Sequence, residues 1–71
     1  MSKDAEMLLN HLNSMNLRGG DFVIIGDLVF LFNGSIDRTQ AAMGELSMLR
    51  LAIGTPTRNA IALPFSGKNS N

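Results

Sequence analysis

Two short polar segments, residues 33–40 and 54–59, hold the side chains best suited to chemistry in this chain. Each contains one arginine, Arg38 or Arg58, among small residues with hydroxyl or amide groups. The first segment opens a predicted helix, where free backbone N–H groups and the helix dipole favour an anion that Arg38 could grip in a bidentate manner. The candidate ligand-binding residues are Ser35, Arg38, Thr39, Thr57, Arg58 and Asn59.

Both segments are also typical of ordinary helix caps and turns. In that interpretation the arginines are solvated or paired with Asp37 and Glu45. Asp37 in addition competes with any anion at the start of the helix, because it places a negative charge there.

Residues arranged for catalysis or metal binding are not found in the sequence. There is no cysteine, and the single histidine, His11, has no acid at a spacing that would orient it. The serines lack a nucleophile-elbow pattern, and turn or solvation roles explain the acidic residues better than a catalytic pair does. We therefore expect a protein that is not an enzyme and that has no metal site and no cofactor.

Length and composition limit the partners. The chain has 71 residues, of which 45% are hydrophobic and 17% charged, and its six basic residues balance six acidic ones. Without a basic field, we expect no binding to nucleic-acid backbones or to membranes.

The polar N-terminus does not resemble a signal peptide, and the apolar run of residues 22–32 is interrupted by Gly26 and Asp27. A cytoplasmic location is predicted.

The N-terminal half predicts a helix and two strands. Capping by Ser2 and helical spacing of Ala5, Leu8 and Leu12 predict a helix over residues 3–17. The apolar, partly β-branched residues 21–32 predict a hairpin that turns at Gly26-Asp27, or else one bent strand with a bulge at Gly26. Neither strand alternates with polar residues, so such a sheet needs cover on both faces.

A second helix is predicted from a cap at Ser35 or Asp37 to about Ile53, and a short strand over residues 59–63. The fold class is therefore α+β, in the order α-β-β-α-β. We expect residues 1–65 to form one compact domain and the polar residues 66–71 to form a flexible tail.

The second helix carries more apolar surface than one contact needs, which predicts a homo-oligomer with an even number of subunits. Gly44 inside it suggests a close helix crossing. The predicted helix between the two segments is roughly 25 Å long, so one chain is not expected to bring Arg38 and Arg58 together. An antiparallel two-fold contact would place Arg38 of one chain beside Arg58 of the other. The predicted interface residues are Ala41, Gly44, Met48, Leu51 and Ala52.

Two functions remain open. The first is a homo-oligomeric binding protein that sequesters or senses a small anionic ligand, plausibly a nucleotide, between subunits. The second is a small protein-interaction module, an inhibitor or adaptor of the phage or bacterial type, that docks on a larger partner through an apolar helix face.

Overall fold

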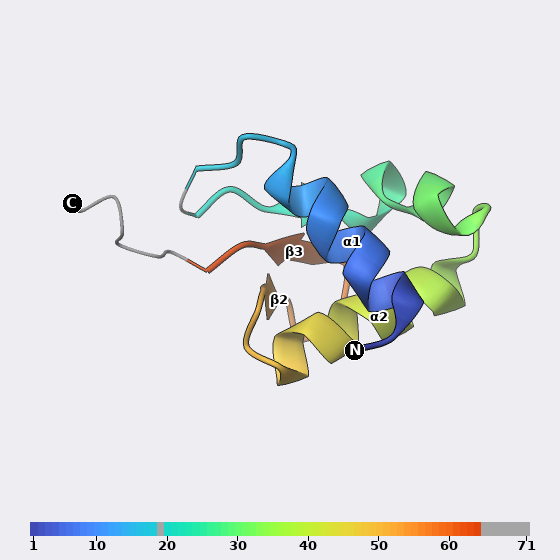
Figure 1. Ribbon diagram of the computed structural model, residues 1–71. Helices are drawn as coiled ribbons and strands as arrows, with labels where there is room; N and C mark the ends of the chain where they lie inside the picture. Colours follow the sequence, from blue (N-terminus) through green and yellow to red (C-terminus); the bar gives the residue numbers. More distant parts are fainter. Residues whose placement is uncertain (19, 65–71) are drawn as a thin grey trace.

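The structure of the protein is a computed structural model, which describes residues 1–18 and 20–64 (Figure 1). Two α-helices pack beside a three-stranded antiparallel sheet. The helices are α1 (Lys3–Asn13) and α2 (Ile36–Met48), and the strands are β1 (Val23–Ile24), β2 (Ile53–Gly54) and β3 (Ala60–Ala62). Two 3₁₀ turns, η1 (Ile25–Asp27) and η2 (Val29–Phe32), lie between β1 and α2. The α+β class is confirmed.

Helix α1 begins where the sequence predicts, because the Ser2 hydroxyl accepts a hydrogen bond from the Ala5 N–H at 3.1 Å. It ends at Asn13, four residues earlier than expected, and Asn16 then has a left-handed backbone with φ of 57°. Ala5, Leu8 and Leu12 form its buried stripe.

The predicted hairpin over residues 21–32 is wrong, and so is the order α-β-β-α-β. Only Val23–Ile24 is a strand in this segment, and residues 25–32 coil into η1 and η2. In a strand, Leu28, Phe30 and Phe32 would share one face, whereas here Leu28 and Phe32 are fully buried and Phe30 is 63% exposed. The helical spacing of four residues sends Leu28 and Phe32 into the core together.

The second helix also ends earlier than expected, at Met48 rather than near Ile53. Arg50 takes a left-handed conformation, with φ of 61°. The N–H of Arg50 donates to Ser47 O at 3.0 Å and the N–H of Leu51 to Leu46 O at 2.9 Å, which is a Schellman motif. This early stop frees residues 53–54 to form β2, a strand that the sequence analysis missed.

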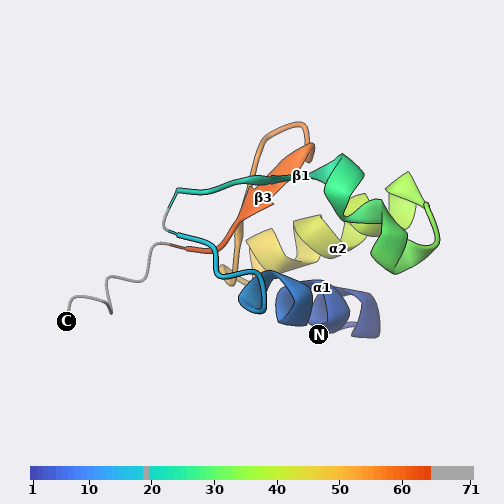
Figure 2. The same cartoon turned by 90° about the horizontal axis from the view of Figure 1, so that it is seen from above.

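β3 is the centre of the sheet, in the order β1-β3-β2. Val23 pairs with Ile61 on one side, and Gly54 pairs with Ile61 on the other. The predicted strand over residues 59–63 is thus confirmed, although its partners lie far from it in sequence. Both helices lie on the same side of the sheet (Figure 2).

The core fills the space between the helices, the 3₁₀ turns and the inner face of the sheet. α1 packs against both α2 and η2. The buried core residues are Ala5, Leu8, Leu12, Val23, Leu28, Phe32, Ala42, Met43, Leu46, Ala52 and Ile61.

Candidate functional site

The first polar segment lies at the start of α2, and its hydrogen-bonding groups are engaged within the chain. Ser35 caps the helix, because its hydroxyl accepts a hydrogen bond from the Arg38 N–H at 3.1 Å. Thr39 is fully buried and donates its hydroxyl hydrogen to Ser35 O at 2.7 Å. These contacts hold the end of the helix.

Arg38 turns toward α1. Its Nε and Nη2 atoms donate to the two Asp4 carboxylate oxygens at 3.1 and 2.9 Å, and its guanidinium lies 5.4 Å from the centre of the Phe32 ring. The hydrogen bonds and charge of Arg38 lower the pKa of Asp4, and those of Asp4 raise the pKa of Arg38. An anion at this position would compete with the Asp4 carboxylate for the bidentate grip.

The second segment is the turn of the β2–β3 hairpin. The Thr55 hydroxyl oxygen accepts hydrogen bonds from the N–H groups of Asn59 and Ala60 at 3.0 and 3.2 Å. The Arg58 N–H donates to Thr55 O at 2.9 Å, and Arg58 has a left-handed φ of 57°. One threonine therefore fixes the turn that carries Thr57, Arg58 and Asn59.

The hairpin folds back along α2, so that Arg58 lies over Gly44. A Cβ atom placed on Gly44 would be 3.0 Å from the Arg58 Cζ. The close approach that the sequence indicated at Gly44 is thus made by an arginine side chain and not by a crossing helix. A pocket of about 270 Å³ lies at this junction, lined by Met43, Gly44, Ser47, Met48, Gly54, Thr55, Pro56 and Arg58.

The six predicted ligand-binding residues therefore occupy two places in one chain. Arg38 meets α1 at the start of α2, and Arg58 meets Gly44, six residues further along the same helix. The helix does not separate the two segments by its whole length, because the hairpin returns Arg58 toward the middle of α2. The structure describes a single chain, so an antiparallel contact between two copies stays a prediction.

The predicted interface residues also divide. Ala41 and Met48 are exposed, Met48 by 83%, and Leu51 is 37% exposed. Gly44 is half-buried beneath Arg58, and Ala52 is buried in the core of its own chain. Ala52 therefore leaves little surface for a contact with another chain, because the chain turns inward directly after the Schellman motif.

His11 lies against an aromatic ring. Its imidazole makes an edge-to-face contact with Phe30 at 5.4 Å between ring centres. Within residues 1–18 and 20–64, no three histidine, cysteine or acidic side chains lie close enough together to hold a metal ion.

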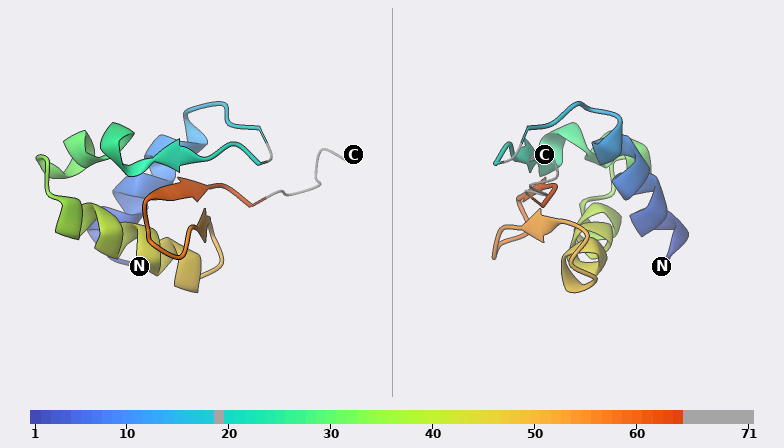
Figure 3. Two further views of the ribbon diagram at one scale, coloured as in Figure 1. Left: turned by 180° about the vertical axis from the view of Figure 1, so that it is seen from behind. Right: turned by 60° about the vertical axis from the view of Figure 1, so that its left-hand side comes forward.

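One arrangement around α2 was not predicted from the sequence. The 3₁₀ turns of residues 25–32 and helix α2 are joined by a short turn, Asn33-Gly34-Ser35, in which Asn33 and Gly34 both have positive φ. The turn thus connects a short helical segment to α2. The β2–β3 hairpin lies beside α2 (Figure 3). The Asn-Gly-Ser turn was the available signal.

No family model, curated protein or solved structure matches the chain. In the part of the chain that the structure describes, neither α-helix is long and apolar enough to cross a membrane.

Proposed function

We propose that this protein binds double-stranded DNA as a small winged helix-turn-helix domain, without catalysis. The observation that carries the proposal is the topology. The element order is α1, β1, a short helical segment, α2, then the β2–β3 hairpin, and the sheet order is β1-β3-β2. In a helix-turn-helix the second helix of the motif lies in the major groove, and in this chain the β2–β3 hairpin, which we call the wing, lies beside that helix.

The outward face of α2 suits such a role. Thr39, Ala42, Met43 and Leu46 face the core, which leaves the opposite side of the helix available. Gln40 stands in the first half of this helix, the part from which recognition residues reach base edges. A glutamine can form two hydrogen bonds with adenine, and the methyl group of an alanine such as Ala41 fits against the thymine methyl.

Arg58 is the cation best placed to meet a DNA phosphate beside α2. The β2–β3 turn carries it, and its guanidinium lies against Gly44. Asp37 in the first turn of α2 opposes phosphate binding. With a net charge of zero, non-specific affinity falls at the weak end of the usual range, about 10⁻⁴ M at physiological salt.

The expectation that the protein does not bind nucleic-acid backbones came from the net charge of the whole chain. A net charge of zero does not give the charge of one face of the molecule. Asp4 and Glu45 are engaged by Arg38 and Ser2, on the side where α1 crosses α2. The small anionic ligand predicted from the sequence would use the same cations as a DNA phosphate does. The two proposals therefore share their chemistry and differ in the size of the ligand.

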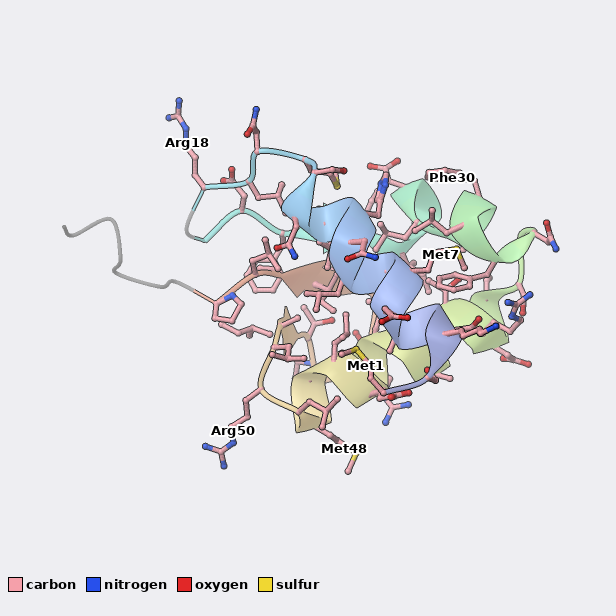
Figure 4. The ribbon with its side chains drawn as sticks, in the orientation of Figure 1. Met1, Met7, Arg18, Phe30, Met48 and Arg50 are labelled. Atoms are coloured by element: carbon pink, nitrogen blue, oxygen red, sulfur yellow. The ribbon has the colours of Figure 1, made fainter. Side chains whose placement is uncertain are left out.

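The test is fluorescence anisotropy with a labelled pool of random-sequence duplexes of about 30 base pairs at roughly 50 mM salt, a condition that favours phosphate contacts. We expect Arg58→Ala to weaken binding and to reduce the salt slope by about 1. Asp37→Asn should strengthen binding. Arg18→Ala is the matched control, because Arg18 projects from the loop after α1, well away from Met48 and Arg50 of the α2 end (Figure 4).

The outcomes separate the candidates. Absence of binding at about 10⁻⁴ M protein, or equal losses for Arg58→Ala and Arg18→Ala, contradicts the DNA proposal. Displacement of the duplex by a free mononucleotide at an equal phosphate concentration favours the small ligand instead.

A second candidate function is docking on a larger protein through the C-terminal part of α2. It is favoured by the exposure of Met48, at 83%, next to Leu49, at 50%. Flexible methionine side chains adapt to apolar partner surfaces. Loss of a partner with Met48→Ser, while DNA binding is retained, would assign this surface to a protein partner.

A further inference from the structure

The pocket between α2 and the wing combines one cation with apolar walls. We call it the junction pocket. It has a volume of about 270 Å³ and is lined by α2 residues between Met43 and Met48 and by wing residues between Gly54 and Arg58. Met43 adds buried apolar surface, and Met48 and Pro56 add exposed apolar surface. Of the described residues that line the pocket, Arg58 alone is charged.

The guanidinium of Arg58 lies flat on α2. A Cβ atom on Gly44 would be 3.0 Å from the Arg58 Cζ and 3.2 Å from each terminal nitrogen, so the glycine meets the face of the guanidinium and not its edge. The guanidinium N–H bonds lie in its plane, and they therefore point along the helix surface. Within residues 1–18 and 20–64, the one ion pair joins Arg38 to Asp4. In this part of the chain, Arg58 thus brings a positive charge to the pocket without a carboxylate partner.

We propose that the junction pocket binds a small monocarboxylate with an apolar body. The planar fork of an arginine matches the two oxygens of a carboxylate. The Ser47 hydroxyl is a further donor on the pocket wall, and the methionine side chains adapt to the shape of an apolar group. Small-molecule sites in general combine a mainly apolar lining with a few polar groups that fix the orientation of the ligand.

Size and charge define the ligand class. At roughly 30 Å³ for each water-sized group, a volume of 270 Å³ holds about nine non-hydrogen atoms, which is the size of benzoate. A mononucleotide is more than twice as large and brings two negative charges to a single arginine. The junction pocket also lies within one chain. It therefore differs from the nucleotide site between subunits that the sequence analysis predicted.

The inference does not rest on DNA binding. Both proposals use Arg58, but the carboxylate is measured on the free protein, so either proposal can fail while the other holds. The apolar body of the ligand separates them, because a DNA phosphate does not need the walls of the pocket. Inorganic phosphate therefore serves as a comparison ligand that has the charge and lacks the apolar body.

The test is a titration of the ¹⁵N-labelled full chain with sodium benzoate up to roughly 20 mM, at constant ionic strength, followed by two-dimensional NMR. We expect saturable shifts of the amide signals of Gly44, Ser47 and Gly54. The dissociation constant should be on the order of 1 mM, as for a ligand of about nine atoms. Benzamide, which has the same shape without the charge, and inorganic phosphate should each bind at least about tenfold more weakly.

Two arginine variants test the cation. Arg58→Asn should raise the dissociation constant for benzoate at least about tenfold, because it removes the charge that holds the carboxylate. Arg50→Asn is the matched control, because both arginines have a left-handed backbone, which asparagine tolerates, and Arg50 does not line the pocket. Arg50 projects away from the chain (Figure 4). Gly44→Ala should also weaken binding, because its methyl group would occupy the place where the guanidinium lies.

The dispersion of the amide signals in the same spectra shows whether each variant is folded. If Arg58→Asn unfolds, Arg58→Lys replaces it, because lysine keeps the charge and lacks the planar fork, and weaker binding is again expected. The proposal would be overturned by the absence of saturable shifts at the junction pocket. Equal affinity for benzoate and benzamide, equal affinity for benzoate and phosphate, or equal losses in Arg50→Asn and Arg58→Asn would also overturn it.

Discussion

Two carboxylates join the helices at the start of the chain. Asp4 receives two hydrogen bonds from Arg38, and Glu45 accepts hydrogen bonds from the Ser2 hydroxyl and the Ser2 N–H, both at 2.7 Å. The hydrogen bonds from Arg38 and from Ser2 lower the pKa of Asp4 and of Glu45, respectively. Both groups are therefore more easily ionised in the folded chain than in the unfolded one.

At this scale we predict a loss of stability in acid. Because the folded pKa values are lowered, the contribution of both groups is complete above their ordinary values of 3.8 and 4.5, and it disappears as the pH falls through the lower folded values. The midpoint temperature of thermal unfolding should therefore decrease as the pH is lowered from about 5 to about 2. Asp4→Asn and Glu45→Gln should each flatten this dependence. Glu6→Gln is the control, because no hydrogen bond of the Glu6 carboxylate is found among the described contacts. If Glu6→Gln flattened the pH dependence as much as Glu45→Gln does, the assignment of this dependence to the Ser2–Glu45 hydrogen bonds would be contradicted.

Helix α2 contains a glycine, Gly44, whose nearest neighbour is the guanidinium of Arg58. Glycine in a helix costs about 0.5–1 kcal/mol relative to alanine. A Cβ on Gly44 would come within 3.0–3.2 Å of the Arg58 guanidinium, the far end of a flexible side chain. The glycine therefore serves the contact with Arg58 and not the stability of the helix.

We predict that Gly44→Ala stabilises the protein by about 0.5 kcal/mol and raises the unfolding midpoint by a few degrees, roughly 2–4 °C. The alanine methyl should displace Arg58 without moving the backbone. In the background of Arg58→Ala, the gain should reach the full helix value of about 1 kcal/mol. If Gly44→Ala destabilised the protein, the Arg58 side chain would be unable to move away from the added methyl group, and the prediction would be contradicted.

The boundaries of the helices and strands show what the sequence could and could not predict. Caps at Ser2 and Ser35 were predicted and are present, because a side chain three residues from its partner N–H is a local feature. Residues 28–32 are all apolar, so they have no period that distinguishes strand from helix. The end of α2 was missed because Arg50 occupies the left-handed position where glycine is usual.

The candidate site depended on contacts distant in sequence. Arg38 was predicted to be a ligand-binding residue, and its bidentate partner, Asp4, lies 34 residues away on α1. Arg58 was correctly grouped with the turn before β3, but its place over Gly44 follows from β2, which was not predicted. Local pattern singled out the two arginines as candidates, whereas tertiary packing decided which residues they contact.

For the whole molecule, stability depends on the inner face of the sheet. Ile61 is fully buried at the centre of β3, whereas Ile53 on β2 is 49% exposed. We predict that Ile61→Val destabilises the chain by about 1 kcal/mol, a substantial share of the roughly 3–5 kcal/mol that so small a core supplies. Ile53→Val should remain within about 0.5 kcal/mol in the monomer. Urea denaturation at low protein concentration measures both, and equal losses would contradict the assignment of the inner face.

The position of β3 in the chain affects how the protein is made. β3 separates β1 from β2 in the sheet, yet it is the last of the three strands to be synthesised. While a ribosome is still adding residues 55–59, β1 has no partner strand and the inner face of the sheet lacks Ile61. The helices can form as they emerge, but the sheet must wait for residues 60–62. Nascent chains of this protein therefore expose a half-built core until β3 has emerged, which is the period in which a chaperone would bind them.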